Sequence, residues 1–407
     1  MNAADSPHAE RIARAALTRL VEPGDALGAA LVRTWGAVRT VRVMTGREEP
    51  TADERQELSL GLRAAGTPLT TTAWRRGLER WRARTPTLAP ERDLETMHRL
   101  GGGLLMPGDT GWPAAVEDLG PAAPLALWYR GAGTMPRSQQ TLAIVGSREA
   151  SAYGRTVTRT LSGGVARHGT TVLSGGAYGI DALAHRSALG TGTGQPVTAA
   201  VLAGGLDRFY PAGNEDLLRE VARQGLLLSE MSPGTSPTRH RFLQRNRLIA
   251  ALAGAVLVVE ARWRSGAQNT AGHALGLGRD LGVVPGPVTS ATSAGCHRLL
   301  RESPAVVVTC AEEALELLPG APPTAATGGT QCPEAGEEPP RPHDHLTVEE
   351  LLVYEALPLR SATAVDRLCA VAGLGPGTVM GVLQRLKRQG LAEQRADGWR
   401  RPAAVPG

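Results

Sequence analysis

The chain has 407 residues, of which 42% are hydrophobic and 3% aromatic, and it carries a formal net charge of +5. This length accommodates two or three domains with a buried core, and no stretch approaches the roughly 18 apolar residues of a membrane span. The mild basic charge suits an anionic partner, although a chain with arginine in place of almost all lysine is also typical of a GC-rich genome.

Lysine and cysteine usage excludes two classes of site. Lys387 is the only lysine, so a phosphate loop of the Walker type, which needs a lysine beside its glycines, is excluded. The four cysteines show no CxxC pair and no metal-ligand spacing, which predicts reduced thiols and neither a metal nor a cofactor. The N-terminus lacks the apolar run of a signal peptide, so we expect a cytoplasmic location.

The chain begins with a region that is predicted to be helical. In residues 1–95, apolar residues recur at helical spacing and prolines separate short segments, which predicts a helical accessory region of the SAM-like type. Whether this region has a binding role or is a lineage-specific extension stays open. Residues 96–138 are rich in turns and are expected to form an extended lead-in to the main domain.

Residues 139–320 alternate between short apolar runs and helical stretches. Such β-branched runs separated by helices predict a Rossmann-like, doubly wound, mostly parallel sheet. Sheets of this kind bind their ligands at the carboxyl ends of the strands. The predicted strands are 142–145, 171–173, 197–202, 226–228, 255–259, 281–284 and 306–309.

The C-terminal part is predicted to be a separate small domain. Residues 321–345 are rich in Pro, Gly and Glu and are expected to form a flexible linker. Residues 346–407 predict three helices followed by a hairpin, which suggests a winged helix. Because this segment is near charge balance, binding to DNA and binding to protein are both open.

Five glycine- and arginine-rich motifs follow predicted strands. Their glycines allow close approach of the backbone, and the helices that follow aim N-terminal amides at the same edge. They predict one phosphate-facing surface. The motifs are IVGSR (144–148), SGGAYGID (174–181), AGGLDRFYP (203–211), QRNRLIA (244–250) and VVEARWRSG (258–266).

The segment 236–250 (SPTRHRFLQRNRLIA) carries the strongest charge pattern. Its arginines are interleaved with His240, Phe242 and Asn246, and no acidic residue occurs between Glu230 and Glu260. A cationic groove with an aromatic platform is typical of proteins that bind single-stranded nucleic acid. Phe209 and Tyr210 in the preceding motif could stack on bases or could instead close the loop over the core. Glu260 could orient an arginine, bind a ribose hydroxyl or form a structural ion pair.

Catalytic alternatives have less support. Ser174, Asp181 and His185 could form a hydrolytic triad, but the Gly-x-Ser-x-Gly elbow is absent and Asp181 is expected to cap a helix. A Rossmann-like nucleotide N-glycoside hydrolase, with Asp181 or Glu230 as the acid, is the main rival hypothesis. The sequence shows no paired carboxylates for that chemistry, so no enzyme activity is predicted. A third hypothesis is a winged-helix regulator with an α/β ligand sensor.

The ordered motifs resemble those of the DNA-processing protein A family (DprA, also called Smf). Several motifs in a fixed order are far more specific than one. The residues that carry the resemblance are GSR at 146–148, SGGAYGIDALAH at 174–185, GLDRFYP at 205–211, FLQRNRLIA at 242–250, SGAQNTAGHA at 265–274 and PGPVTSATSAGCHRLL at 285–300.

The resemblance implies a homodimer that binds and protects incoming single-stranded DNA and loads the RecA recombinase in natural transformation. Two positions depart from the family pattern: Leu243 replaces the usual proline, and Ala212 stands where many relatives have a lysine. The predicted DNA-binding residues are Ser147, Arg148, Ser174, Gly175, Gly176, Arg239, Phe242, Arg245, Asn246, Arg247, Ser265 and Gly266.

Overall fold

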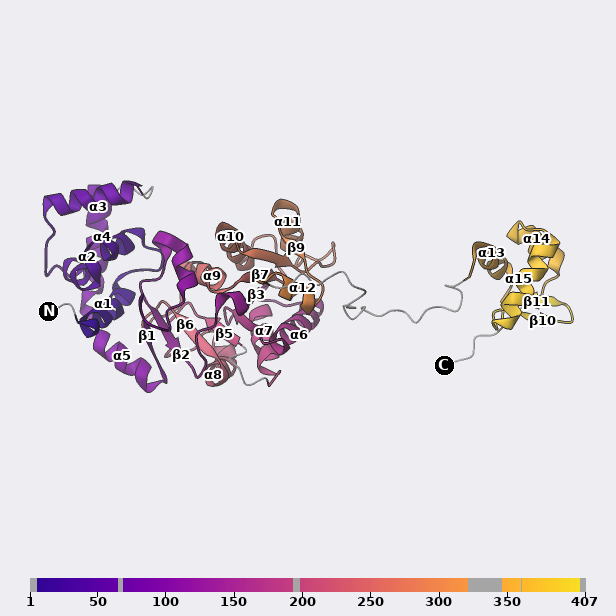
Figure 1. Ribbon diagram of the computed structural model, residues 1–407, viewed down its shortest axis with the longest axis horizontal. Helices are drawn as coiled ribbons and strands as arrows, with labels where there is room; N and C mark the ends of the chain where they lie inside the picture. The colour runs from indigo at the N-terminus through magenta and orange to yellow at the C-terminus, as the bar shows by residue number, and fades with distance from the viewer. Residues whose placement is uncertain (1–5, 65–68, 193–197, 321–345, 360, 403–407) are drawn as a thin grey trace. The chain divides into compact units, whose positions relative to one another are not determined.

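The computed structural model describes residues 6–64, 69–192, 198–320, 346–359 and 361–402 (Figure 1). The described parts form two compact units, one before and one after residues 321–345 in the sequence. The predicted linker lies outside the described residues.

The described residues of the N-terminal region form α-helices, several of which have an N-cap side chain that bonds to the first turn. Ser6, Asp25 and Thr70 each accept a hydrogen bond from a backbone amide of the helix that follows. The first four of these helices bury a shared cluster that includes Leu17 and Trp81, whereas Met97 of the fifth packs in the cluster beside the sheet. They are α1 (Pro7–Leu20), α2 (Ala26–Met44), α3 (Ala52–Ala64), α4 (Thr71–Arg84) and α5 (Pro90–Arg99).

A mostly parallel sheet forms the centre of the first unit, as the sequence predicts. Within the described residues it has nine strands, in the order β1-β2-β6-β5-β4-β3-β7-β8-β9. Strands β3 to β9 run parallel, whereas β1 and β2 pair antiparallel at one edge. The strands are β1 (Gly102–Leu105), β2 (Leu127–Arg130), β3 (Thr141–Val145), β4 (Thr171–Ser174), β5 (Thr198–Val201), β6 (Leu226–Ser229), β7 (Ala255–Val258), β8 (Asp280–Val283) and β9 (Val306–Val307).

Helices cover both faces of the sheet, because its strands are apolar on both sides. In β3, Leu142 and Ile144 pack on the face covered by α6 (Ala152–Arg167), α7 (Ile180–Leu189) and α12 (Ala311–Glu316). Farther along the same face, α8 (Glu215–Gln224) packs on β5 and β6. Ala143 and Val145 face α9 (Arg239–Leu252), α10 (Gly266–Gly276) and α11 (Ala294–Glu302) on the other side. Short 3₁₀ segments connect these elements: η2 (Thr85–Thr87), η3 (Ala114–Ala122), η4 (Ser138–Gln140) and η5 (Ala212–Asn214).

The order in which the strands are connected creates a crevice at the carboxyl ends of two central strands. The chain runs outward from β3 through β4 and β5 to β6, then returns through α9 to place β7 on the other side of β3. The strand order therefore reverses between β3 and β7, which is where open α/β sheets bind ligands. Helix α9 begins at Arg239, where the side chain of the N-cap residue Thr238 accepts a hydrogen bond from the amide of Arg241.

The second unit has a core of its own. It contains α13 (Val348–Ala356), α14 (Val365–Ala372), α15 (Pro376–Arg388) and a hairpin of β10 (Glu393–Arg395) and β11 (Gly398–Arg400). Trp399 packs with Val353, Leu368 and Leu383. The hairpin also forms a bridge from Trp399 to Thr363.

The cysteines differ from expectation at one position. Cys296 and Cys369 are free, but Cys310 is disulfide-bonded, so the prediction of reduced thiols is wrong for Cys310. Among the residues that the structure describes, no helix has the length and apolarity needed to cross a membrane. The same residues contain no cluster of potential metal ligands.

Candidate nucleic-acid interface

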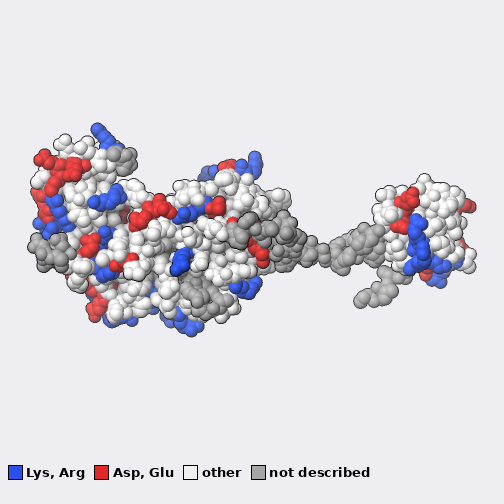
Figure 2. Space-filling model, viewed as in Figure 1, with Lys and Arg blue, Asp and Glu red and all other residues white. Residues whose placement is uncertain are grey.

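A cavity of about 910 Å³ lies at the carboxyl ends of β3 and β7. It is bounded by the loop after β3, the first turns of α9 and the loop between β7 and α10. On the face drawn in Figure 2, basic and acidic side chains are interspersed. The cavity lining, in contrast, has an excess of basic side chains: Arg148, Arg239, Arg245, Arg262, Arg264 and Arg298 against the acidic Glu149 and Asp181.

An aromatic pair flanked by arginines lies in this lining. The Phe242 and Tyr210 ring centroids are 5.8 Å apart. Arg148, which follows β3, places its Cζ 5.0 Å from the Phe242 centroid, and Arg245 places its Cζ 5.8 Å from it. Tyr210 is 54% exposed and Phe242 is half-buried, so part of the aromatic surface is open to a ligand. Guanidinium groups beside open rings offer cation–π and stacking contacts to a base together with charge for its phosphate.

Arg245 brings a buried positive charge to the cavity. Its Nη1 donates to the carbonyl of Val201 at 2.8 Å, and its Nε is buried without a hydrogen-bond partner in the described part of the chain. Burial lowers the pKa of Arg245 to about 10, with Asp181 opposing this shift and Arg148 adding to it, so the group stays protonated at neutral pH. A buried cation with an unsatisfied donor favours an anionic ligand.

Gly175 leaves room for this arginine, and Asp181 lies near enough to act on its charge. Asp181 accepts hydrogen bonds from the amides of Gly175 and Ala177, at 3.1 and 3.3 Å. Burial raises the pKa of Asp181 above its ordinary value, against the opposing effect of Arg245. A Cβ at residue 175 would collide with Nη1 of Arg245, so a glycine is required for this close approach.

Helix α10 opens its N-terminus toward the cavity. Ser265 is the N-cap residue, but its side chain forms no capping hydrogen bond, which leaves the first amides of the helix without a side-chain partner. Asn246 of α9 donates to Gly266 O and Asn269 Oδ1, at 3.3 and 3.1 Å, and so joins the two helices. Free amides at a helix start are suited to phosphate binding.

The structure brings eight of the predicted residues to the cavity. They are Ser147, Arg148, Arg239, Phe242, Arg245, Asn246, Ser265 and Gly266. Gly175 contributes indirectly through Arg245, whereas Gly176 faces Leu218 and Leu202. Ser174 is fully buried and donates to the carbonyl of Ile144 at 2.6 Å, so its hydroxyl is engaged inside the core.

The prediction that Arg247 lines the cavity is wrong. Its side chain is buried and pairs with Glu230 at 2.7 Å. Two residues along an α-helix correspond to a rotation of about 200°, so Arg247 leaves α9 on a different side from Arg245. In the RNR motif (245–247), Arg245 therefore places its guanidinium in the cavity lining, and Arg247 places its own in a structural ion pair.

Sequence reasoning missed several residues of the lining. Arg262, Trp263 and Arg264 lie in the VVEARWRSG motif (258–266) and line the cavity. The predicted DNA-binding residues include only Ser265 and Gly266 of this motif. Arg298 comes from α11 and reaches the cavity through tertiary packing alone. The sequence did not decide whether Phe209 and Tyr210 face a ligand or the core. Tyr210 lines the cavity, whereas Phe209 packs on the core, with its ring centroid 4.8 Å from Cζ of Arg130.

The residues of the rejected triad have structural partners. His185 is fully buried, and its Nδ1 lies 2.7 Å from the hydroxyl of Thr198. Burial, aided by the charge of Arg245, lowers the pKa of His185 to about 3, so the ring is neutral. Glu260 accepts hydrogen bonds from Ser151 and Thr292, which differs from each role weighed from the sequence.

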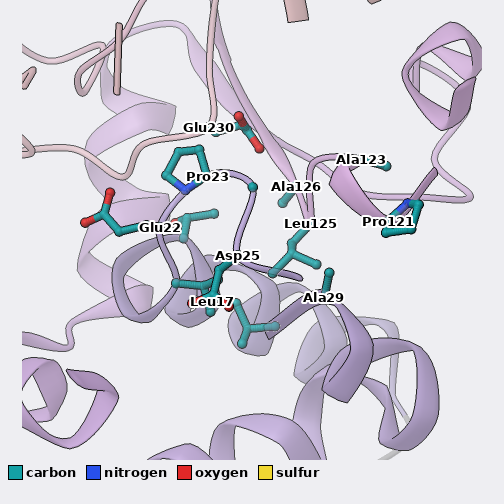
Figure 3. Close-up of a pocket in the computed structure, with 13 residues that line it drawn as sticks. Leu17, Glu22, Pro23, Asp25, Ala29, Pro121, Ala123, Leu125, Ala126 and Glu230 are labelled. Carbon is teal, nitrogen blue, oxygen red and sulfur yellow. The ribbon is translucent and has the colours of Figure 1, made fainter. Parts of the chain in front are cut away.

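Glu230, a candidate acid of the hydrolase hypothesis, is absent from the lining of this cavity. It faces a separate, small cavity of about 30 Å³ between the N-terminal helices and the sheet (Figure 3). Glu22 and Asp25 line the same small cavity (Figure 3). The two carboxylates proposed for catalysis, Asp181 and Glu230, thus lie in different places and do not form a pair.

The fold and the cavity define an α/β protein with a cationic, aromatic-lined site at the switch point of a parallel sheet. Residues 103–319 match the family model described as DNA recombination-mediator protein A. A Mycobacterium tuberculosis relative that carries the DprA name is 46% identical over 322 residues, covering 76% of this chain and 79% of the relative. The chain therefore belongs to the DprA/Smf family.

Two further comparisons agree with this assignment. Protein Smf of Synechocystis is 32% identical over 334 residues, which covers 75% of this chain and 82% of that protein. The X-ray structure of DNA processing protein A from Streptococcus pneumoniae aligns with a TM-score of 0.57 at 26% identity, covering 75% of this chain and 96% of that one.

Proposed function

We propose that this protein binds single-stranded DNA in the strand-end cavity and acts in DNA processing as its family name indicates. One observation carries the proposal: Arg148 and Arg245 both lie against the Phe242 ring, within a single cavity that has six arginines in its lining. The arginines would bind phosphates and the rings would stack on bases. Bases are free to stack on protein rings only when they are unpaired, so the proposed ligand is a single strand.

The proposed binding involves no catalytic step. Asp181 already accepts two backbone hydrogen bonds, and Glu230 pairs with Arg247 away from the cavity. For the rival function, hydrolysis of a nucleotide N-glycosidic bond, the described residues that line the cavity offer one carboxylate besides Asp181, that of Glu149, and it pairs with Arg262 at 2.6 Å. Release of free base from nucleoside monophosphates by the purified protein would overturn this part of the proposal.

Further parts of the proposal concern partners and location. The protein would protect incoming DNA and load RecA recombinase onto it in the cytoplasm, in keeping with the recombination-mediator description of its family. It would act as a homodimer; the edge strand β9, with Val306 and Val307 each about half exposed, is a candidate dimer surface. The proposed domains are residues 1–95, 96–138, 139–320, a linker at 321–345, and a winged helix at 346–407 whose three helices and hairpin favour that fold.

Filter binding with single- and double-stranded DNA over a salt series tests the proposal. The expected result is preferential binding of the single strand, with log K falling by about 0.7 per phosphate contact for each unit of log salt. Arg148→Ala should weaken binding and reduce that slope by about one contact. Binding that is insensitive to salt, or that prefers duplex, would contradict the proposed function.

A further inference from the structure

We infer that Trp263 forms a second base-stacking subsite in the cavity, separate from the Phe242–Tyr210 pair. The inference rests on the proposed single-strand binding and specifies how a strand would occupy the site. It concerns a residue in the loop between β7 and α10, whereas Phe242 belongs to the first turn of α9.

The exposure of Trp263 is the first observation. Its side chain lines the cavity and is 54% exposed, whereas Trp81, Trp128 and Trp399 are almost completely buried in their cores. An exposed indole contributes little to folding, since its apolar area stays in contact with water. A ligand that covers the ring would gain that contribution on binding.

A cation supports the indole from a neighbouring helix. The Cζ of Arg298 in α11 lies 5.1 Å from the centroid of the Trp263 ring. Arg298 is itself held by Glu302, one helical turn on, at 2.7 Å. The guanidinium occupies one side of the ring and leaves indole surface exposed, as in sites where an arginine and an aromatic ring together hold a base.

Hydrogen bonds to its backbone hold the loop that carries Trp263. The side chain of Gln268 donates to the carbonyls of Arg262 and Trp263, both at 2.8 Å. Upstream, Ala261 donates to the carbonyl of Thr292 at 2.8 Å and accepts from the amide of Gly295 at 2.7 Å. The backbone of the loop is thus held by hydrogen bonds without a ligand, and Arg298 contacts the ring, which reduces the entropy lost on binding.

Trp263 is distinct from the first aromatic pair. Tyr210 and Phe242 contact each other, but Trp263 contacts no aromatic ring among the residues that the structure describes. Arg264 follows it and forms no ion pair within the same described residues. Two separate ring surfaces with arginines beside each suit two bases of one strand, with their phosphates held by the guanidinium groups.

The test uses the full chain and an oligothymidylate of about 20 nucleotides, in which single positions are replaced by abasic residues. Trp263→Ala should weaken binding roughly fivefold to a hundredfold, the range for loss of one base–aromatic stack, and Trp263→Phe should weaken it less. DNA should quench the tryptophan emission of the wild type, and this quenching should be largely lost in Trp263→Phe. Trp112→Phe is the matched control, because Trp112 bonds to Glu117 and lines a different cavity.

The outcomes separate this inference from the proposed function. DNA binding by the wild type should be weakened by abasic replacement at two positions of the oligonucleotide. Binding by Trp263→Ala should be weakened by replacement at only one. If binding requires Arg148 but Trp263→Ala binds as tightly as wild type with unchanged quenching in Trp263→Phe, the second subsite is refuted and single-strand binding stands. If wild type does not bind the oligonucleotide, both ideas fail.

Discussion

Glu22, in the turn between α1 and α2, holds Arg241 in the first turn of α9 through two hydrogen bonds. Its Oε2 accepts from Nε at 2.9 Å and its Oε1 from Nη2 at 2.7 Å. Arg84 of α4 donates to the same Oε1 at 2.5 Å. These hydrogen bonds therefore join the N-terminal helices to α9, the helix that carries Arg239 and Phe242 of the cavity lining. This contact assigns them a structural role that their sequence left open.

Glu22→Gln should destabilise the protein, because it weakens three charge-assisted hydrogen bonds and leaves Arg241, which is half-buried, without its counter-charge. We expect the free energy of unfolding at neutral pH to fall by about 1–3 kcal/mol, measured by urea denaturation. Glu215→Gln is the control, since the Glu215–Arg219 pair is exposed and such pairs contribute little. Equal stability of wild type and Glu22→Gln would show that the contact is energetically neutral.

The stabilising effect of Glu22 should depend on pH. Burial alone would raise the pKa of Glu22, but Arg241 and Arg84 together lower it below the ordinary value of 4.5. A carboxylate whose folded-state pKa is lowered stabilises the fold above its unfolded-state pKa and loses that effect as pH falls. The stability difference between wild type and Glu22→Gln should therefore be constant above about pH 5 and shrink below about pH 4.5. A difference that grows on acidification would contradict this assignment.

Arg247→Ala should damage the fold, whereas Arg148→Ala should damage binding alone. The side chain of Glu230 is only 10% exposed, and removing Arg247 leaves it without its partner. Breaking a buried ion pair typically lowers the free energy of unfolding by about 3–5 kcal/mol. Arg148 is exposed, so its removal should leave the melting temperature nearly unchanged. Thermal melts and DNA titrations of both variants check the contrast. Reversed phenotypes would place Arg247, not Arg148, at the DNA.

The sequence anticipated the mostly parallel sheet and the position of the cavity at the carboxyl ends of its strands, because buried parallel strands are continuous apolar runs with glycine-rich turns at their ends. It could not separate Arg245 from Arg247, since their difference lies in the direction each leaves the helix and in the position of Glu230. It also missed Arg298, which only the packing of α11 brings to the cavity. The antiparallel strand β2 was hidden for a similar reason: its partner β6 lies about a hundred residues away, and β1 in turn pairs with β2.

Gly175→Ala offers a test of the cavity that leaves every charge in place. The added Cβ would collide with Nη1 of Arg245 and force the guanidinium away from Val201 O. Because hydrogen bonds to charged groups contribute about 1.5–3 kcal/mol, loss of the contact between Arg245 and a phosphate should weaken DNA binding at least roughly tenfold. Gly163→Ala in α6 is the matched control, since a Cβ there meets its nearest neighbour, Arg167 Nη1, at an ordinary 3.5 Å. Unchanged binding by Gly175→Ala would mean that Arg245 does not contact the DNA, because its guanidinium cannot keep its present position beside a methyl group at residue 175.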